Sequence, residues 1–308
     1  MSHTDLSIPI RRAPSLSTVL EFFKPVTWFA PMWAFACGAV SSGAALGDRL
    51  LFVAAGVVLA GPFACAASQA VNDWFDRHVD AINEPQRPIP SGRLPGRWGF
   101  YIALFWSGAT MLLGAALGPW AFGASIVATA LAWMYSAPPF RLKTDGWLGP
   151  TAVGFSYEGV AWFTGAAVML GAFPGWPIVG LAVLYSIGAH GIMTLNDFKA
   201  IEGDTRFGVR SLPVQLGPRR AAQVACGVMI APQIIVALWL LTADAPVHGA
   251  ALLAVIAAQI ALMPTLLRDP RGKAPWYNAT GVTLFVSGMM VAAFAVRSLY
   301  MVSNGAGV

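Results

Sequence analysis

Charge is scarce in this sequence: Asp, Glu, Lys and Arg make up 11% of its 308 residues, whereas hydrophobic residues make up 57%. The mean hydropathy of +0.64 excludes an ordinary water-soluble globule of this length. The three cysteines lie far apart in apolar stretches, without CxxC or Cys/His spacing, so we interpret them as packing residues. The first 20 residues lack an apolar core, so no secretory signal is expected. The sequence therefore predicts an integral membrane protein.

Long uncharged stretches predict an all-α fold that crosses the membrane repeatedly. A helix needs about 20 apolar residues to cross roughly 30 Å of hydrocarbon. We expect nine transmembrane helices, over residues 25–47, 50–72, 98–117, 120–138, 148–171, 177–196, 221–243, 246–267 and 275–296. They would form one domain over residues 21–298, with a cytoplasmic tail at 1–20 and a short tail at 299–308.

The basic residues predict the orientation of the chain in the membrane. With a cytoplasmic N-terminus, 17 of the 19 Lys and Arg residues lie on the cytoplasmic side, and only Arg49 and Arg297 lie on the other. Loops 73–97 and 197–220 are then cytoplasmic, and their length favours short helices that form a lid. The net charge of +5 follows from these loops and requires no nucleic acid; membrane lipid and phosphorylated substrates are the expected partners.

Two acidic clusters interrupt the apolar sequence, each at the cytoplasmic end of an even-numbered span. The first is Asn72-Asp73-x-x-Asp76-x-x-x-Asp80, and the second is Asn196-Asp197 followed by Glu202 and Asp204. Both begin with Asn-Asp, 124 residues apart. The pattern predicts two four-helix repeats plus a ninth helix in one bundle, with the clusters facing each other across a central cavity. A solvated helix end explains either cluster alone, but the matching positions favour a functional site.

Each cluster offers the oxygen ligands that Mg2+ prefers. Asn72, Asp76 and Asp80 are spaced by four, so they lie on one face if the helix continues. Asp197 and Asp204 are seven apart, which corresponds to two turns of a continuous helix. We therefore expect two Mg2+ ions. Carboxylates near hydrocarbon need such a countercharge, because each costs roughly 2.5 to 3.5 kcal/mol to insert.

Basic residues beside both clusters predict a pyrophosphate site, since Arg presents a planar fork to phosphate oxygens and Lys a point charge. The candidates are Arg77, Arg87, Arg93, Arg141, Lys143 and Lys199. Arg87 and Lys143 are preferred, Lys143 in a catalytic role. Topology alone also explains each of them, because cytoplasmic loops are generally basic. A diphosphate beside a membrane cavity indicates a donor with a hydrocarbon tail, such as an isoprenyl diphosphate.

Further candidates for substrate contacts lie inside the spans. The departing pyrophosphate leaves an allylic cation, which aromatic rings shield from water. Tyr135 and Tyr157 are among the aromatic candidates, although helix packing explains most such residues. Glu158 and His190 are ionisable groups inside spans, which are functional hypotheses by default. We expect Glu158 near the acceptor, and for His190 an acceptor contact, orientation of the second cluster, or a plain core role.

These motifs resemble those of a known family. The first cluster, continued by Glu84-Pro-Gln-Arg87-Pro-Ile-Pro-Ser-Gly-Arg93, is similar to the first aspartate motif of the UbiA-type intramembrane prenyltransferases, in the form typical of their chlorophyll synthase branch. Ser-Tyr-Glu158-Gly-Val-Ala-Trp162-Phe-Thr-Gly and the segment from His190 to Asp204 resemble the bacteriochlorophyll synthase subgroup. The resemblance extends from about residue 20 to residue 297.

The resemblance implies nine helices around a cavity, with Mg2+ bridging a prenyl diphosphate to both aspartate motifs. The implied metal ligands are Asn72, Asp76 and Asp80 for the first ion and Asp197 and Asp204 for the second. Asp73, Asn196 and Glu202 would contact the substrate. Many relatives carry another acid at the position of Ala200, so the second ligand set is open, and Glu202 is a possible substitute.

The implied reaction is esterification of the bacteriochlorophyllide propionate by geranylgeranyl or phytyl diphosphate, with release of pyrophosphate. A carboxylic acid with an ordinary pKa near ~4.3 is already ionised at neutral pH, so no general base is required. The implied location is a bacterial cytoplasmic or photosynthetic membrane, where contacts with other pigment-synthesis or photosystem-assembly proteins are conceivable.

Three alternatives stay open. A quinone-type or haem-type prenyltransferase shares the diphosphate chemistry and differs in the acceptor. A cation transporter would also use paired acids in a helical repeat, but near the bilayer midplane. A pigment-binding structural subunit would need His ligands in several spans, and only His190 and His248 qualify.

Overall fold

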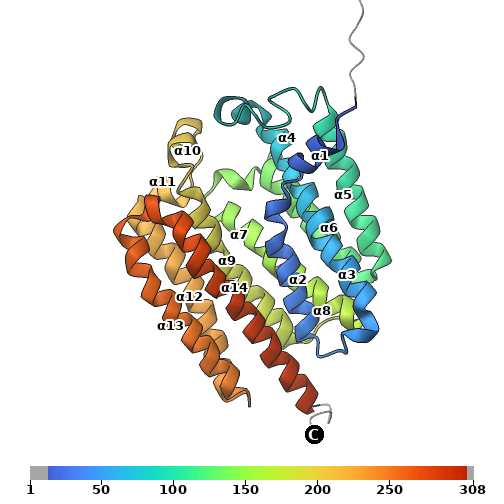
Figure 1. The fold of residues 1–308 in the computed structure, drawn as a ribbon, viewed down its shortest axis with the longest axis vertical. Coiled ribbons are helices and arrows are strands. Elements are labelled where there is room, and N and C mark those ends of the chain that lie inside the picture. The colour runs from blue at the N-terminus through green and yellow to red at the C-terminus, as the bar shows by residue number, and fades with distance from the viewer. Residues whose placement is uncertain (1–12, 304–308) are drawn as a thin grey trace, which may run out of the picture.

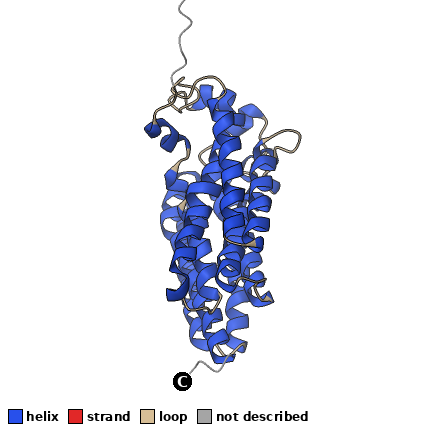
Figure 2. Ribbon diagram, turned by 90° about the vertical axis from the view of Figure 1, so that its right-hand side faces the viewer, coloured by secondary structure: helices blue, strands red, loops and turns tan. Residues whose placement is uncertain are grey.

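The computed structural model describes residues 13–303 of the chain, and helices joined by turns and loops make up this part (Figure 1). The only extended pairing among the described residues is an isolated bridge between Asp145 and Arg210. The predicted all-α fold is therefore confirmed. Figure 2 shows that the long helices run along the long axis of the molecule, so that most connections lie at its two ends.

The helices in chain order are α1 (Leu16–Phe22), α2 (Phe29–Ser41), α3 (Leu50–Val58), η3 (Leu59–Cys65), α4 (Ala66–Asn83), α5 (Trp98–Ala116), α6 (Pro119–Ser136), η4 (Leu142–Thr144), α7 (Leu148–Gly154), η5 (Phe155–Val160), α8 (Ala161–Leu170), α9 (Trp176–Asp197), α10 (Ile201–Phe207), α11 (Leu212–Leu216), α12 (Pro218–Thr242), α13 (Pro246–Arg268) and α14 (Pro270–Ser303). Segments η3 and η5 are π-helical and continue directly into their α-helical neighbours. Segment η4 is a 3-10 turn, as are η1 (Pro25–Thr27) and η2 (Gly47–Arg49).

Helical segments lie in all nine ranges in which we expected spans. Six helices of the described chain are long and apolar enough to cross a membrane: Leu50–Asn83, Trp98–Ala116, Trp176–Asp197, Pro218–Thr242, Pro246–Arg268 and Pro270–Met301. The other three ranges contain α2, α6 and the α7–η5–α8 segment, whose helices are shorter or less apolar. Helix α1 begins in the segment expected as an N-terminal tail and ends two residues beyond it. Residues 1–12 and 304–308 of the two tails lie outside the described residues.

Proline sets the start of many of these helices. Pro119, Pro177, Pro218 and Pro246 occupy the first turn of α6, α9, α12 and α13. Their ring fixes φ at a helical value, and the missing N–H has no partner in a first turn anyway. The connections before these helices are short for this reason, and sequential helices pack as neighbours, as in α5 with α6 and α12 with α13.

Two glycines bring α2 and α8 into backbone contact. A side-chain carbon on Gly38 would lie 1.9 Å from the Trp162 carbonyl oxygen, and one on Gly165 would lie 2.1 Å from the Phe35 carbonyl oxygen. Small residues permit this close approach, which drives helix association where lipid supplies no hydrophobic force. The contact joins the first helix of the bundle to the middle of the chain.

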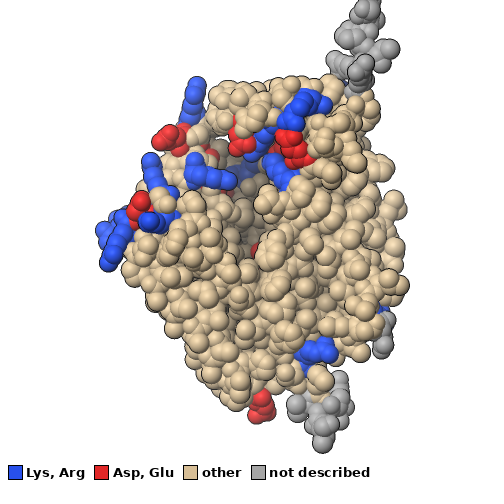
Figure 3. Space-filling model, in the orientation of Figure 1, with Lys and Arg blue, Asp and Glu red and all other residues tan. Residues whose placement is uncertain are grey.

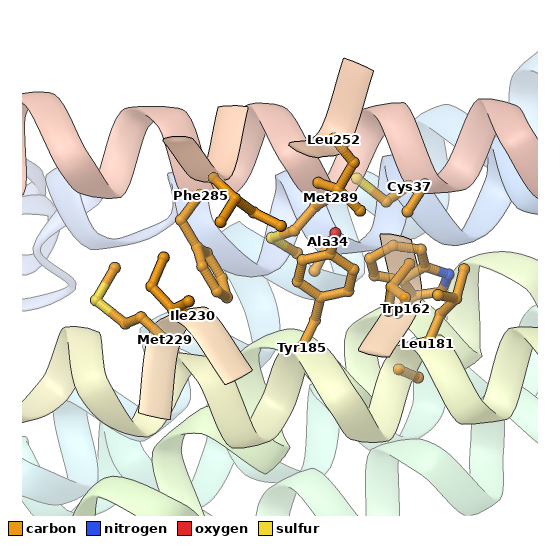
Figure 4. Packing of buried hydrophobic residues seen from close by; sticks show 14 of the residues in the cluster. Ala34, Cys37, Trp162, Leu181, Tyr185, Met229, Ile230, Leu252, Phe285 and Met289 are labelled. Atoms are coloured by element: carbon orange, nitrogen blue, oxygen red, sulfur yellow. The ribbon is translucent and has the colours of Figure 1, made fainter. Parts of the chain in front are cut away.

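The C-terminal half packs around a set of large buried side chains (Figure 4). Trp162 stacks on Tyr185 at 5.5 Å, and Phe285 meets Tyr185 edge-on at 5.4 Å. Their polar atoms are satisfied: Trp162 donates to Ser41 Oγ at 3.0 Å, and the Tyr185 hydroxyl donates to the Gly288 carbonyl at 2.9 Å. Helices α2, α8, α9 and α14 are thus joined by apolar contact and by hydrogen bonds, which positions the ends that carry the acidic clusters.

Candidate active site

Both acidic clusters lie at the same end of the bundle. Figure 3 shows Lys, Arg, Asp and Glu side chains around a hollow near one end of the molecule, while most of this face is free of charge. The C-terminal end of α4 and helix α10 both lie at that end (Figure 1). A side-chain carbon on Gly203 of α10 would lie 3.7 Å from Nδ2 of Asn83, the last residue of α4. The two clusters are therefore neighbours in space although they are far apart in sequence.

Helix α4 continues through the first cluster, whose four residues form two pairs that differ in their contacts. Asp73 and Asp80, seven residues apart, share Arg87: its Nη1 lies 2.9 Å from Asp80 Oδ2 and 3.5 Å from Asp73 Oδ1. Lys24 also donates to Asp73 Oδ1, at 2.6 Å. Asp73 and Asp80 are buried, so each needs this countercharge, and Asp73 Oδ2 is a buried oxygen without a hydrogen-bond partner.

The second pair, Asn72 and Asp76, is held from the other side. Asn72 Nδ2 donates to Asp76 Oδ2 at 3.0 Å and to Ser136 Oγ at 3.3 Å. Lys143 Nζ lies 2.5 Å from Asp76 Oδ1, and its side chain is only 11% exposed. Because α4 is continuous, Asn72, Asp76 and Asp80 lie on one face of it, as predicted. The cations nevertheless divide the carboxylates, since Lys143 pairs with Asp76 and Arg87 pairs with Asp80 and Asp73.

The second cluster is not one continuous helix. Helix α9 ends at Asp197, a turn follows, and α10 begins at Ile201 with Asp204 in its first turn. The predicted two-turn stacking of Asp197 and Asp204 is therefore wrong. Ser211 Oγ donates to Asp204 Oδ2 at 2.6 Å and fixes this carboxylate. Burial raises the pKa of Asp204, and the hydrogen bond from Ser211 opposes that rise.

Tyr135 lies near both clusters. Its phenol, near the end of α6, is within electrostatic range of the carboxylates of Asp197, Asp76 and Asp204, in decreasing order of strength. The neighbouring Ser136 contacts Asn72. Carboxylates of both clusters therefore act on one phenol at this end of the bundle.

Two cations are partly buried against the first cluster. Burial lowers the pKa of Lys143, and the Asp76 carboxylate opposes this change. Burial also acts to lower the pKa of Arg87, but the Asp73 and Asp80 carboxylates outweigh it and hold that pKa above the ordinary value. Lys143 and Arg87, the preferred candidates from the sequence, are thus both in contact with the acidic residues.

Other predicted contacts lie away from these acidic residues. Arg93 forms a bidentate pair with Glu21, with Nη2 2.7 Å from Oε1, and also donates to the Gln86 carbonyl. Arg77 lies over the Trp74 ring, 4.2 Å from its centroid, and donates to the Trp74 carbonyl. The structure therefore engages Arg93 and Arg77 with protein groups instead of directing them to either cluster. Further exposed residues of the predicted set are Arg141, Lys199 and Glu202.

The candidates inside the spans are buried. Glu158 belongs to the π-helical segment η5 and is 6% exposed. His190 is 5% exposed, its ring lies tilted against that of Trp147 with the centroids 5.5 Å apart, and its buried Nε2 has no hydrogen-bond partner. Asn196 accepts a hydrogen bond from Asn278 Nδ2 at 2.9 Å, which ties α9 to α14.

Sequence reasoning missed the contacts that Lys24, Ser136 and Ser211 make with the acidic residues. Lys24 lies 49 residues before Asp73, in a segment whose basic residues were used only to predict the orientation of the chain in the membrane. A basic residue followed by proline just before the first span was the one available signal for it. Ser136 and Ser211 carried no signal, because a hydroxyl group pairs with an acid only through the tertiary fold.

Two apolar cavities lie inside the bundle. One, of about 210 Å3, is lined by residues that include Ser68, which is one helical turn before Asn72, and Tyr135. The other, of about 440 Å3, lies between α2, η3, α6, η5 and the start of α8, and small residues such as Ala60, Ala64 and Ala128 line it. Ser156 and Tyr157 line both cavities. Charged groups of the first cluster thus lie beside apolar space.

The chemistry of the acidic clusters fits Mg2+ shared with a phosphate ligand. No three Asp, Glu, His or Cys side chains within residues 13–303 are grouped as a ready metal site. Mg2+, however, usually binds one or two carboxylates, keeps water and completes its shell with substrate phosphates. The buried, unpartnered Asp73 Oδ2 and the carboxylates held by Lys24, Arg87 and Lys143 are oxygen atoms of the kind that such an ion binds.

Comparison with known proteins shows the family to which this chain belongs. The family model described as the UbiA prenyltransferase family matches residues 26–289. The chain belongs to the UbiA prenyltransferase family. The bacteriochlorophyll synthase 33 kDa chain of Cereibacter sphaeroides is 55% identical and aligns over 96% of this chain and 98% of its own. The protein of the same name from Rhodobacter capsulatus is 54% identical, over 96% and 99% of the two chains.

Solved structures agree on the fold. The structure of a UbiA homolog from Archaeoglobus fulgidus bound to GPP and Mg2+ superposes with a TM-score of 0.72 and 21% identity, over 91% of this chain and 99% of that one. With the family established, the predictions of a UbiA-type prenyltransferase and of an integral membrane protein are confirmed. The closer resemblance to bacteriochlorophyll synthases is confirmed as a sequence relationship.

Proposed function

We propose that the protein transfers a geranylgeranyl or phytyl group from its diphosphate to the propionate carboxylate of bacteriochlorophyllide, with Mg2+ as cofactor and pyrophosphate as second product. The observation that carries the proposal is that the first acidic cluster, with its paired cations, lies beside apolar cavities of the bundle. A diphosphate with a hydrocarbon tail matches both parts. Two relatives that are 54–55% identical over nearly their full length are named bacteriochlorophyll synthase chains, and these names support bacteriochlorophyllide as the acceptor.

The donor end of the reaction is assigned to the first cluster and its cations. Asn72, Asp76 and Asp80 would hold one Mg2+ and Asp197 and Asp204 the other, which together would supply positive charge to the departing pyrophosphate. Lys143 and Arg87 lie against the same carboxylates and are positioned to donate to the diphosphate oxygens. Asp73, paired with Lys24, would position these groups.

In the reaction, the bond between the diphosphate oxygen and C1 of the prenyl group breaks, and its electron pair leaves with the pyrophosphate. An oxygen of the acceptor carboxylate forms the new bond to C1. No net proton transfer is needed, since the acceptor is already ionised at neutral pH. Tyr135 offers a ring face to the allylic cation and helps to exclude water.

The acceptor is assigned to the buried polar groups of the spans. Glu158 and His190 are the ionisable side chains there, and His190 Nε2 has an unused hydrogen-bonding capacity. Asn196 and Lys199 flank Asp197 and would contact the substrate at the rim, together with Arg141 and Glu202.

The membrane arrangement extends this proposal. All nine helical ranges would cross the membrane as one domain over residues 21–298, with two four-helix repeats and a ninth helix. The N-terminus and both acidic clusters would face the cytoplasm, because the basic residues concentrate on that side. Membrane lipid and other pigment-synthesis or photosystem-assembly proteins are proposed neighbours.

The test is product analysis with the purified protein in nanodiscs. Geranylgeranyl diphosphate and Mg2+ are supplied with bacteriochlorophyllide, with chlorophyllide, or with a quinone precursor, and the ester and pyrophosphate are quantified. We expect the bacteriochlorophyllide ester, and no product when EDTA removes the metal. Product with the quinone precursor alone would assign the protein to another branch of the family.

A further inference from the structure

The two cavities lie in series along the bundle. The smaller one is next to the acidic clusters: Ser68 is one turn of α4 before Asn72, and Tyr135 adjoins the Ser136 that contacts Asn72. The larger one begins deeper. Ala128 of α6 lines it, seven residues before Tyr135, which is roughly 10 Å along a helix axis. We name them the proximal cavity and the distal cavity.

The two cavities differ in size. The proximal cavity encloses about 210 Å3 of space between protein atoms, and the distal cavity encloses about 440 Å3. A long prenyl tail that starts at the acidic clusters therefore finds most of this space in the distal cavity.

Tyr157 lies where the two cavities meet. It lines both of them, and only Ser156 shares this property. Its hydroxyl oxygen is held from α4 and η3: Gln69 Nε2 donates to it at 3.2 Å and the Cys65 thiol at 3.3 Å. Cys65 in turn lies 3.3 Å from Thr27 Oγ1. An aromatic ring that is tied by two donors is a fixed partition and not a free side chain.

The local backbone explains how Tyr157 comes to this position. Residues 155–160 form the π-helical segment η5, which inserts an extra residue into the helical path and turns the following side chains. The facing segment η3 is also π-helical and supplies Cys65. Single π-helical turns are rare and occur frequently at functional sites.

We propose that Tyr157 sets the length of the prenyl tail that the enzyme uses, by forming the partition between the proximal and distal cavities. This inference rests on the proposed function, because it takes a prenyl diphosphate as the donor. The ring, held by Gln69 and Cys65, limits the opening through which the far half of a C20 tail reaches the distal cavity. A C10 tail ends before this opening. Tyr157 is thus a positioning residue for the tail, remote from the reacting atoms.

The experiment compares kcat/KM for geranyl (C10), farnesyl (C15) and geranylgeranyl (C20) diphosphates with the same acceptor in nanodiscs. Tyr157→Trp enlarges the partition and is expected to lower the C20-to-C10 ratio at least tenfold. Tyr157→Ala removes the partition and is expected to raise that ratio. Tyr157→Phe keeps the ring but loses both hydrogen bonds, and is expected to shift the ratio in the same direction as Tyr157→Ala.

A second pair of variants tests the distal cavity without touching Tyr157. Ala128→Phe fills this cavity and is expected to lower the C20-to-C10 ratio at least tenfold. Ala130→Phe, two residues along the same helix on its exposed face, is the matched control and is expected to behave as the wild type.

The outcomes separate the two proposals. If the wild type transfers no prenyl group to the acceptor, the proposed function fails. If the wild type transfers the C20 group but the Trp, Ala and Phe variants change kcat/KM by the same factor at all three lengths, the partition is overturned while the proposed function stands. Equal ratios for Ala128→Phe and Ala130→Phe would likewise overturn it, because the tail would then avoid the distal cavity.

Discussion

Lys143 provides the sharpest test of the site, because its removal should move two measurable quantities in opposite directions. Its Nζ lies 2.5 Å from Asp76 Oδ1, and the pair is largely buried, with side chains 11% and 20% exposed. In the proposed reaction, Lys143 donates to the departing diphosphate, while Asp76 binds Mg2+. Lys143 therefore assists turnover but competes with the metal for one carboxylate.

The size of each effect follows from the geometry. Removal of one positioned donor to a developing negative charge costs about 10² to 10³ in kcat, and we expect this loss for Lys143→Met. Two unit charges 4 Å apart at an effective dielectric constant near 20 attract by about 4 kcal/mol before desolvation is counted. If a quarter of this attraction between Lys143 and Asp76 remains after desolvation, it amounts to about 1 kcal/mol. Mg2+ would then bind Asp76 roughly fivefold more tightly in the Lys143→Met variant.

The assay is a Mg2+ titration of prenyl transfer in nanodiscs, with thermal unfolding as a check of the fold. The matched control is Lys273→Met, since Lys273 is an exposed lysine in the first turn of α14 and its loss is expected to change neither quantity. The reasoning is refuted if Lys143→Met keeps kcat within threefold of the wild type. It is refuted equally if that variant requires more Mg2+ for half-maximal activity.

Four further predictions address other parts of the molecule. Asp76→Ala or Asp197→Ala should abolish turnover and leave the helical circular dichroism unchanged; Mg2+-dependent activity in either variant would contradict the assignment. Glu158→Gln should raise KM for the tetrapyrrole acceptor and not for the prenyl diphosphate, as steady-state kinetics with each substrate varied will show. Gln233 and Gln259 exchange two hydrogen bonds between α12 and α13, at 3.1 and 3.0 Å. Gln233→Leu or Gln259→Leu should each destabilise the protein by about 1–3 kcal/mol, while the double variant should recover part of that loss in unfolding experiments. Mg2+ and pyrophosphate should bind cooperatively, so that calorimetry detects tighter Mg2+ binding when pyrophosphate is present; independent binding would count against the site.

The sequence predicted the fold well because membrane helices follow from composition. Apolar stretches, helix-starting prolines such as Pro119 and Pro177, and the helical content needed no tertiary information. The same rules gave no account of η3 and η5, because a π-helical turn depends on how neighbouring helices pack. Tyr157 was therefore one of several aromatic candidates in the sequence, and only the structure shows that it separates two cavities.

The acidic residues of the site were predictable, but their partners were not. Asp73, Asp76 and Asp80 stand out in a chain with only 14 acids. Helical spacing placed Asp80 on the same face as Asp76, as the continuous α4 confirms, but it could not show that Arg87 from the following loop bridges Asp80 and Asp73. Similarly, the spacing of Asp197 and Asp204 suggested one helix, although a turn separates them. Periodicity describes one element at a time, so it does not predict ion pairs between elements.

The cations at the first cluster explain how its carboxylates persist at a membrane surface and how they become available to metal. Asp73, Asp76 and Asp80 are each paired, with Lys24, Lys143 or Arg87, so a dication alone meets a site whose charge is already balanced. A diphosphate changes this balance, because it offers these cations new anionic partners and leaves the carboxylates to the metal. Each ligand then improves the site for the other, and by linkage the effect is reciprocal. Metal and donor are therefore expected to bind together. The positive charge of the metal is then present in the site only when the diphosphate, which is the leaving group, is bound as well.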